Sequence, residues 1–167
     1  MPEPKGYSSA QVALHWAIVI LIILQLLFHD AIEDAFGDRM DGDAVRAEDE
    51  LGAMLHVAVG ITILVLAIIR LTLRLRLGAP PVPPQHNRAM RVVARATHVV
   101  LYGFIFLQPI SGASAWFLGV ETPARVHAFL VWYVFAPVVA AHIAGALAEH
   151  FVFKTDVLRR MLKPARR

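Results

Sequence analysis

The sequence contains no cysteine, and charged residues make up only 17% of its 167 positions. The absence of cysteine excludes disulfide frameworks, iron–sulfur clusters and zinc sites built on thiolates. A soluble domain is about one quarter charged and about half apolar. This chain instead is 57% hydrophobic and has a mean hydropathy of +0.58. These values exclude a disordered chain and disfavour an ordinary soluble domain, and the length predicts one domain, residues 1–167.

Four stretches are long and apolar enough to cross a bilayer, which takes about 20 residues of helix. They cover about residues 9–28, 51–73, 92–118 and 125–147. Each is apolar around most of its circumference, as lipid requires. The first lacks a small-residue cleavage site, so we expect a retained helix rather than a secretory signal. The sequence therefore predicts an all-α fold, an integral membrane four-helix bundle in contact with the lipid bilayer.

The connections between these stretches differ in charge. Nine of the 13 acidic residues lie in the first connection, the predicted loop 29–50. The second connection, residues 74–91, is basic and rich in proline. Six basic residues follow the last stretch: Lys154, Arg159, Arg160, Lys163, Arg166 and Arg167. Because basic connections stay on the cytoplasmic side, we expect both termini in the cytoplasm and the acidic loop outside. We expect no nucleic-acid partner.

Histidines inside the four predicted helices are candidates for function, because ionisable residues are costly in a membrane. His56 and His127 lie near the outer face, in the second and fourth helices. His15 and His98 lie near the cytoplasmic face, in the first and third. His142 follows His127 by fifteen residues, roughly 22 Å along the helix and about 60° around it. One helix thus offers two imidazoles on nearly one face, one in each leaflet.

This arrangement matches two low-spin haems, because each needs two axial ligands and neutral imidazole supplies them. His56 and His127 form the outer pair by depth. His142 can pair with His15 at the inner depth, where His98 competes with His142. A zinc or copper site would need all ligands to converge on one point, which the vertical separation forbids. A haem-free membrane protein that uses histidine and arginine for proton or ion transport is the alternative of another class.

Two arginines lie where they could bind haem propionates. Arg70 follows His56 by fourteen residues, on nearly the same helix face and at the inner membrane edge. An anchor on the positive inner side is the alternative for Arg70. Arg125 could serve an outer propionate in the same way. The remaining histidines lie at helix ends or in loops and are interpreted as solvated surface residues: His29, His86 and His150.

Pro137 lies inside the fourth predicted helix, ten residues after His127 and five before His142. Proline lacks the donor for an intrahelical bond, and its ring clashes with the preceding turn. A single π-bulge would absorb one residue and bring the two imidazoles to within about 40° of one face. We therefore predict a bend or bulge between Phe129 and Pro137, with both histidines facing the bundle interior.

Motifs along nearly the whole chain, in order, resemble one known family. They are Ala13-Leu14-His15-Trp16, Leu55-His56 with Gly60 and Arg70, His98-x3-Tyr102 before Pro109-x-Ser111-Gly112, and His127 and His142 with the closing HFVFKTDVLRRMLKP. The chain resembles the bacterial cytochrome b561 family, dihaem four-helix proteins of the inner membrane. The resemblance implies two haem b groups on His15, His56, His127 and His142. It favours His142 over His98, which would lie beside the inner haem and bond a propionate or a quinone.

The same resemblance implies a quinone-linked oxidoreductase that exchanges electrons with ubiquinone, with periplasmic superoxide as donor in a superoxide oxidase. Three features depart from the family pattern. This chain has Glu149-His150 where members commonly have two histidines, and the outer connection 119–124 is short. The acidic loop should repel superoxide and attract a basic redox protein, unless it is only a solvated face. We therefore expect a dihaem cytochrome that transfers electrons between a quinone and a periplasmic donor or acceptor.

Overall fold

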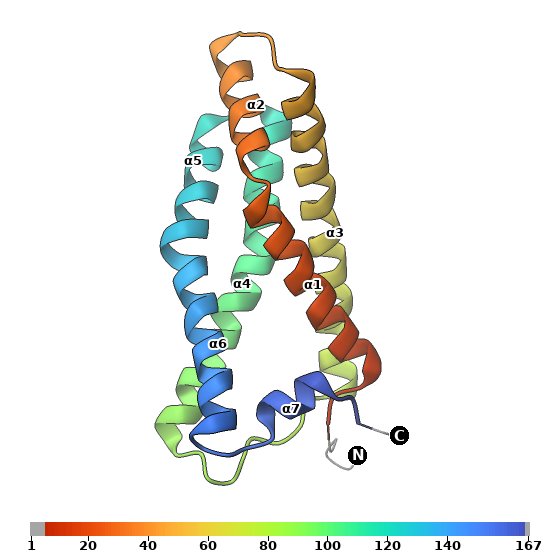
Figure 1. The fold of residues 1–167 in the computed structure, drawn as a ribbon, viewed down its shortest axis with the longest axis vertical. Coiled ribbons are helices and arrows are strands. Elements are labelled where there is room, and N and C mark those ends of the chain that lie inside the picture. The colour runs from red at the N-terminus through yellow and green to blue at the C-terminus, as the bar shows by residue number, and fades with distance from the viewer. Residues whose placement is uncertain (1–5, 166–167) are drawn as a thin grey trace.

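The computed structural model describes residues 6–165, and its long helices run side by side (Figure 1). The first three crossings are α1 (Ser9–Leu27), α3 (Ala47–Leu77) and α4 (Arg88–Leu118). The fourth is divided into α5 (Glu121–Leu130), a π-helix called η1 (Val131–Phe135) and α6 (Ala136–Phe151). All four are long and apolar enough to cross a membrane, which confirms the four predicted spans and the all-α fold.

Two shorter helices lie outside the crossings, α2 (Asp30–Asp41) and α7 (Val157–Leu162). The connection 29–50, predicted as a loop, is therefore helical over much of its length. Asp30 and Glu33 lie in the first turn of α2, which suits the helix dipole, whereas the last turn holds Arg39 together with Asp38 and Asp41. Gly42 then ends α2 in the left-handed conformation with φ 81°, which glycine adopts without strain.

The interior of the bundle is centred on a small apolar cluster of Ile18, Ile63 and Ala67, which joins α1 to α3. Many other large apolar side chains point outward. Leu27 of α1 is 65% exposed, and Leu107 of α4 is 62% exposed. This pattern suits helices surrounded by lipid, because apolar contact between helices gains little where the solvent is itself apolar.

The two ends of the described chain meet at one end of the bundle, called here the terminal end (Figure 1). The backbone N–H of Ala165 donates to the carbonyl oxygen of Tyr7 at 2.9 Å. The segment α7 is fastened to α1, because the indole N–H of Trp16 donates to the carbonyl oxygen of Met161 at 2.8 Å. Two basic residues of the predicted tail lie outside the described part of the chain: Arg166 and Arg167.

At the opposite end of the bundle, called here the α2 end, α2 packs against the start of α3. The Nε atom of Arg46 lies 2.6 Å from Oδ2 of Asp49, and this hydrogen bond raises the pKa of Arg46. Gly52 of α3 lies so close to Ala31 of α2 that a Cβ atom at position 52 would collide with the Ala31 methyl group. The glycine therefore allows α2 to lie directly on α3.

The π-helix η1 ends two residues before Pro137, inside the interval where a bend or bulge was predicted. The N–H of Ala136 donates to the carbonyl oxygen of Val131, five residues earlier, where an α-helix would have a spacing of four. Pro137 then occupies the start of α6, where a missing N–H is tolerated. The prediction of a local break in the fourth crossing is confirmed.

Candidate cofactor-binding sites

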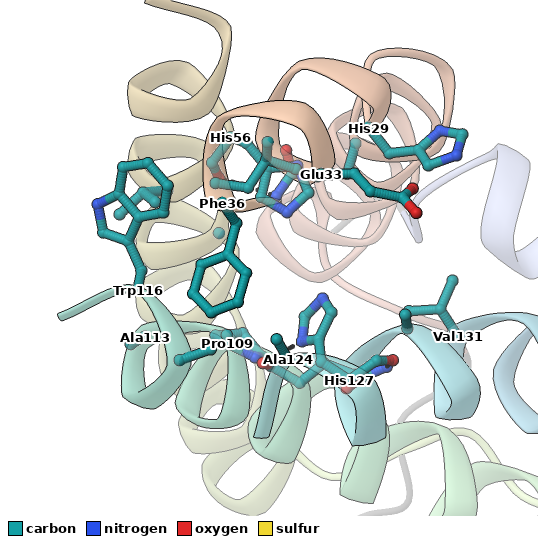
Figure 2. A pocket seen from close by; sticks show the side chains of 18 of the residues that line it. His29, Glu33, Phe36, His56, Pro109, Ala113, Trp116, Ala124, His127 and Val131 are labelled. Atoms are coloured by element: carbon teal, nitrogen blue, oxygen red, sulfur yellow. Dashed lines mark hydrogen bonds between the residues drawn. The ribbon is translucent and has the colours of Figure 1, made fainter. Parts of the chain in front are cut away.

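A cavity of about 700 Å³ lies near the α2 end, between α2 and the surrounding crossings. Its walls are mainly apolar, and its volume falls in the range of small-molecule and cofactor sites. His56 from α3 and His127 from α5 project toward one another across this space (Figure 2). The cavity thus encloses the two histidines that were predicted to form the outer pair.

The two imidazoles are spaced for a shared metal ion. Their ring centres are 6.4 Å apart. Two imidazoles on opposite sides of one metal, each bonded at ~2.0 Å, have ring centres about 6.3 Å apart. Within residues 6–165, no three histidine or carboxylate side chains converge on a metal-sized point. A set of two facing imidazoles in an apolar cavity is the donor set that haem takes, so these residues fit the group.

Hydrogen bonds to α4 fix the orientation of the His127 ring. Its Nδ1 atom lies 3.0 Å from the carbonyl oxygen of Gln108 and 3.1 Å from the hydroxyl of Ser111. A proton on Nδ1 that is donated to this carbonyl leaves the Nε2 lone pair free to bind a metal. Gly112 makes room for the ring, because a Cβ atom there would lie 3.2 Å from Cε1 of His127.

The backbone of His56 is also held in place, since the side-chain amide of Gln25 donates to its carbonyl oxygen at 2.9 Å. The Nδ1 atom of His56 is buried and has no hydrogen-bond partner in the protein. Gly60, one turn later on α3, lines the same cavity. Gly60 therefore adds no side chain to the wall around His56, and the Gln25 side chain lies beside it.

Three further histidines gather nearer the terminal end, on α1, α4 and α6. The rings of His98 and His142 have centres 5.4 Å apart. His15 lies within electrostatic range of both. A ring separation of 5.4 Å is shorter than the about 6.3 Å of two imidazoles on opposite sides of one metal. The rings of His98 and His142 are therefore too close together to lie on opposite sides of one metal, and the contact with His98 places His142 against α4 rather than lipid.

The two arginines predicted as propionate partners lie at different levels. Arg70 donates from Nη1 to the carbonyl oxygen of Gln11 at 2.7 Å and lies within electrostatic range of the inner histidines. Arg125 lines the cavity near the α2 end, where Nη1 lies 3.8 Å from Oε1 of Glu121. Both side chains retain donors for a further anionic group.

The surroundings of one histidine contradict the prediction made for it. His86, expected on a solvated surface, is only 7% exposed. Its Nε2 atom lies 2.8 Å from Oε1 of Glu149, and the hydroxyl of Thr155 donates to Oε2 of the same carboxylate at 2.7 Å. The connection that carries His86 folds back under α6, which removes the imidazole from water. Glu149, the carboxylate near the end of the apolar fourth crossing, was the signal of such a partner.

The other two loop histidines differ from each other. His150 is exposed, as predicted. His29 is half-buried, lines the cavity with Glu33 (Figure 2), and has its ring centre 5.4 Å from that of Trp132. The prediction of a solvated His29 is therefore only partly correct, because α2 turns this residue toward the cavity.

Comparisons with known proteins match the chain over nearly its whole length. The sequence profile of the family described as prokaryotic cytochrome b561 matches residues 6–164. A cytochrome b562 of Cereibacter sphaeroides is 32% identical over 167 residues, which cover 98% of this chain and 99% of the relative. A probable superoxide oxidase CybB of Yersinia pestis is 28% identical, covering 97% and 98%. Cytochrome b561 homolog 2 of Escherichia coli is 29% identical, covering 95% and 92%. The chain therefore belongs to the prokaryotic cytochrome b561 family, multi-pass proteins of the bacterial inner membrane that bind haem b and transfer electrons.

Proposed function

We propose that this protein is a dihaem b-type cytochrome that transfers electrons between ubiquinone and a redox partner at the α2 end. The facing imidazoles of His56 and His127, 6.4 Å apart in an apolar cavity, are the observation that carries the proposal. The inner group of histidines supports a second haem. The basic residues of the 74–91 connection and of the tail support a cytoplasmic terminal end and a periplasmic α2 end.

In this proposal, His56 and His127 bind the outer haem, and His15 and His142 bind the inner one. The π-helix supports this choice, because it absorbs one of the fifteen residues between His127 and His142. The remaining fourteen steps bring both imidazoles to within about 40° of one face. His98, at the same level as His142, is then free to bond a propionate or a quinone. The four proposed metal ligands are thus His15, His56, His127 and His142.

The protein would contribute binding, orientation and an apolar surrounding. When bound, haem would supply a one-electron carrier, which the paired histidines would hold. Mainly apolar walls surround His56 and His127, and the Gln108 carbonyl fixes the His127 ring. Arg70 and Arg125 would neutralise propionates at the inner and outer levels. Such a site suits outer-sphere electron transfer.

We propose superoxide as the periplasmic donor, on the strength of the similarity to a probable superoxide oxidase. A basic redox protein is the second candidate, and the charge of the α2 end favours it. Arg39 lies 3.0 Å from Glu50, and Arg46 lies 3.3 Å from Asp34, so acidic neighbours already neutralise these cations. The surplus of carboxylates would slow the approach of an anion and attract a cationic partner.

A reduced-minus-oxidised optical spectrum of the purified protein tests the class of function, together with haem quantified per chain. We expect an α-band in the b-type region and two haems. Absence of the band would reject the proposal in favour of a haem-free membrane transporter. Reduction of ubiquinone on addition of superoxide then tests the donor, and reduction only by a basic redox protein would select the second candidate.

A further inference from the structure

Phe135 is the largest hydrophobic side chain buried within residues 6–165, and it is 7% exposed. It is the last residue of η1, in a fourth crossing whose other large apolar side chains are mostly exposed. For comparison, Phe129 of α5 is 56% exposed. Burial of one phenylalanine in the interior of this crossing requires an explanation, because lipid would solvate the ring equally well.

The position of Phe135 along the crossing relates it to both histidines. It follows His127 by eight residues and precedes His142 by seven. Since η1 absorbs one residue, each interval corresponds to two helical turns, about 10 Å of rise. Phe135 therefore lies on the same face as the two imidazoles and midway between them.

A second aromatic ring meets Phe135 from α4. The ring centres of Phe104 and Phe135 are 5.5 Å apart, with planes inclined at 48°. Both rings line the cavity that contains His56 and His127. Because Phe135 lies two turns from His127 in the direction of His142, the two rings line this cavity on the side that faces the inner histidines.

We propose that Phe104 and Phe135 form the packed contact through which electrons cross between the outer and inner haem sites, an inference that rests on the proposed dihaem function. One electron leaves the outer carrier and one arrives at the inner carrier, while neither ring is oxidised and no proton moves. Tunnelling weakens much more steeply through empty space than through packed atoms. The rings are positioning residues that keep this interval filled and free of water.

The test uses the purified holoprotein with Phe135→Ala and Phe104→Ala, and Phe129→Ala as the control. Phe129 stacks on Tyr133 with ring centres 4.9 Å apart and is largely exposed. A flash-excited soluble flavin reduces the outer haem, and transfer to the inner haem is followed optically. We expect transfer to become several-fold slower in both variants, with two haems retained and both midpoint potentials unchanged. The control should transfer at the wild-type rate.

An unchanged rate in a variant that retains both haems would overturn the inference, as would equal slowing in the control. If the alanine variants lose haem, the double variant Phe104→Leu with Phe135→Leu fills most of the space and replaces them. It should also transfer more slowly, because leucine leaves part of the gap empty, and an unchanged rate there would overturn the inference. One haem per chain in the wild type would instead reject the proposed function.

Discussion

Replacing Gly112 by alanine should weaken haem binding at the outer site through the His127 ring. A Cβ atom at position 112 would lie 3.2 Å from Cε1 and 3.3 Å from Nδ1 of His127. These separations are shorter than ordinary van der Waals contacts, so the ring must move by a few tenths of an ångström. That movement disturbs the contacts of Nδ1 with Gln108 and Ser111, which orient the nitrogen that we propose binds the metal.

The size of the effect follows from the overpacking at His127. Overpacking of a filled site costs about 1–3 kcal/mol. The gain in helix propensity, about 0.5–1 kcal/mol, is the same with and without haem and does not change haem binding. An overpacking cost of about 1.4 kcal/mol that falls on the haem-bound state corresponds to about tenfold weaker haem binding.

The assay is haem per chain after purification with limiting haem, together with the reduced-minus-oxidised spectrum. Gly103→Ala is the control on the same helix, because a Cβ atom there would meet no atom within 4 Å. We expect Gly112→Ala to lose haem from the outer site only, and Gly103→Ala to retain both haems. Full haem content and an unchanged spectrum in Gly112→Ala would refute the proposed orientation of His127.

Four further predictions test other parts of the structure. His127→Ala should halve the haem content, because the outer haem loses one of two ligands, and an unchanged content would contradict the pairing. Deletion of Val134 should convert η1 to a regular turn with both haems retained, and loss of the inner haem would show that the π-helix does not absorb a residue. Neutralising the acids of residues 38–50 should raise the rate of superoxide oxidation at low salt. If a basic protein docks there, the same change should instead slow the reduction of that protein and weaken its dependence on salt. No change in either assay would show that these acids form only a solvated surface. His86→Ala should lower the stability in detergent by about 1–3 kcal/mol, measured by thermal unfolding, because the Glu149 carboxylate loses a hydrogen-bond partner. Adding Glu149→Gln should recover part of the loss, and no recovery would contradict the role of this hydrogen bond.

The crossings could be predicted from the sequence because lipid imposes one rule on every residue of a span: the backbone bonds internally and the side chains are apolar. The π-helix could be predicted because Pro137 coincides with a spacing of His127 and His142 that is one residue too long for one helix face. Depth along the helices was enough to pair His56 with His127, since both lie at corresponding distances from a connection.

Features that depend on contacts distant in sequence could not be predicted. The helix α2 docks where Gly52 meets Ala31, and no local pattern signals that approach. The burial of His86 depends on Glu149, 63 residues away. Depth alone could not separate His98 from His142 either, because both occupy one level, and the structure places their rings in contact.

The contacts that close the terminal end also set an order of events during synthesis. Trp16 enters the membrane with the first crossing, whereas its hydrogen-bond partner Met161 is made 145 residues later. The first crossing must therefore be held by its own apolar residues and then by α3, with which it shares the cluster around Ile18. The terminal end closes only when the last segment has left the ribosome. A chain truncated before α7 would keep all four crossings and still lack this closure.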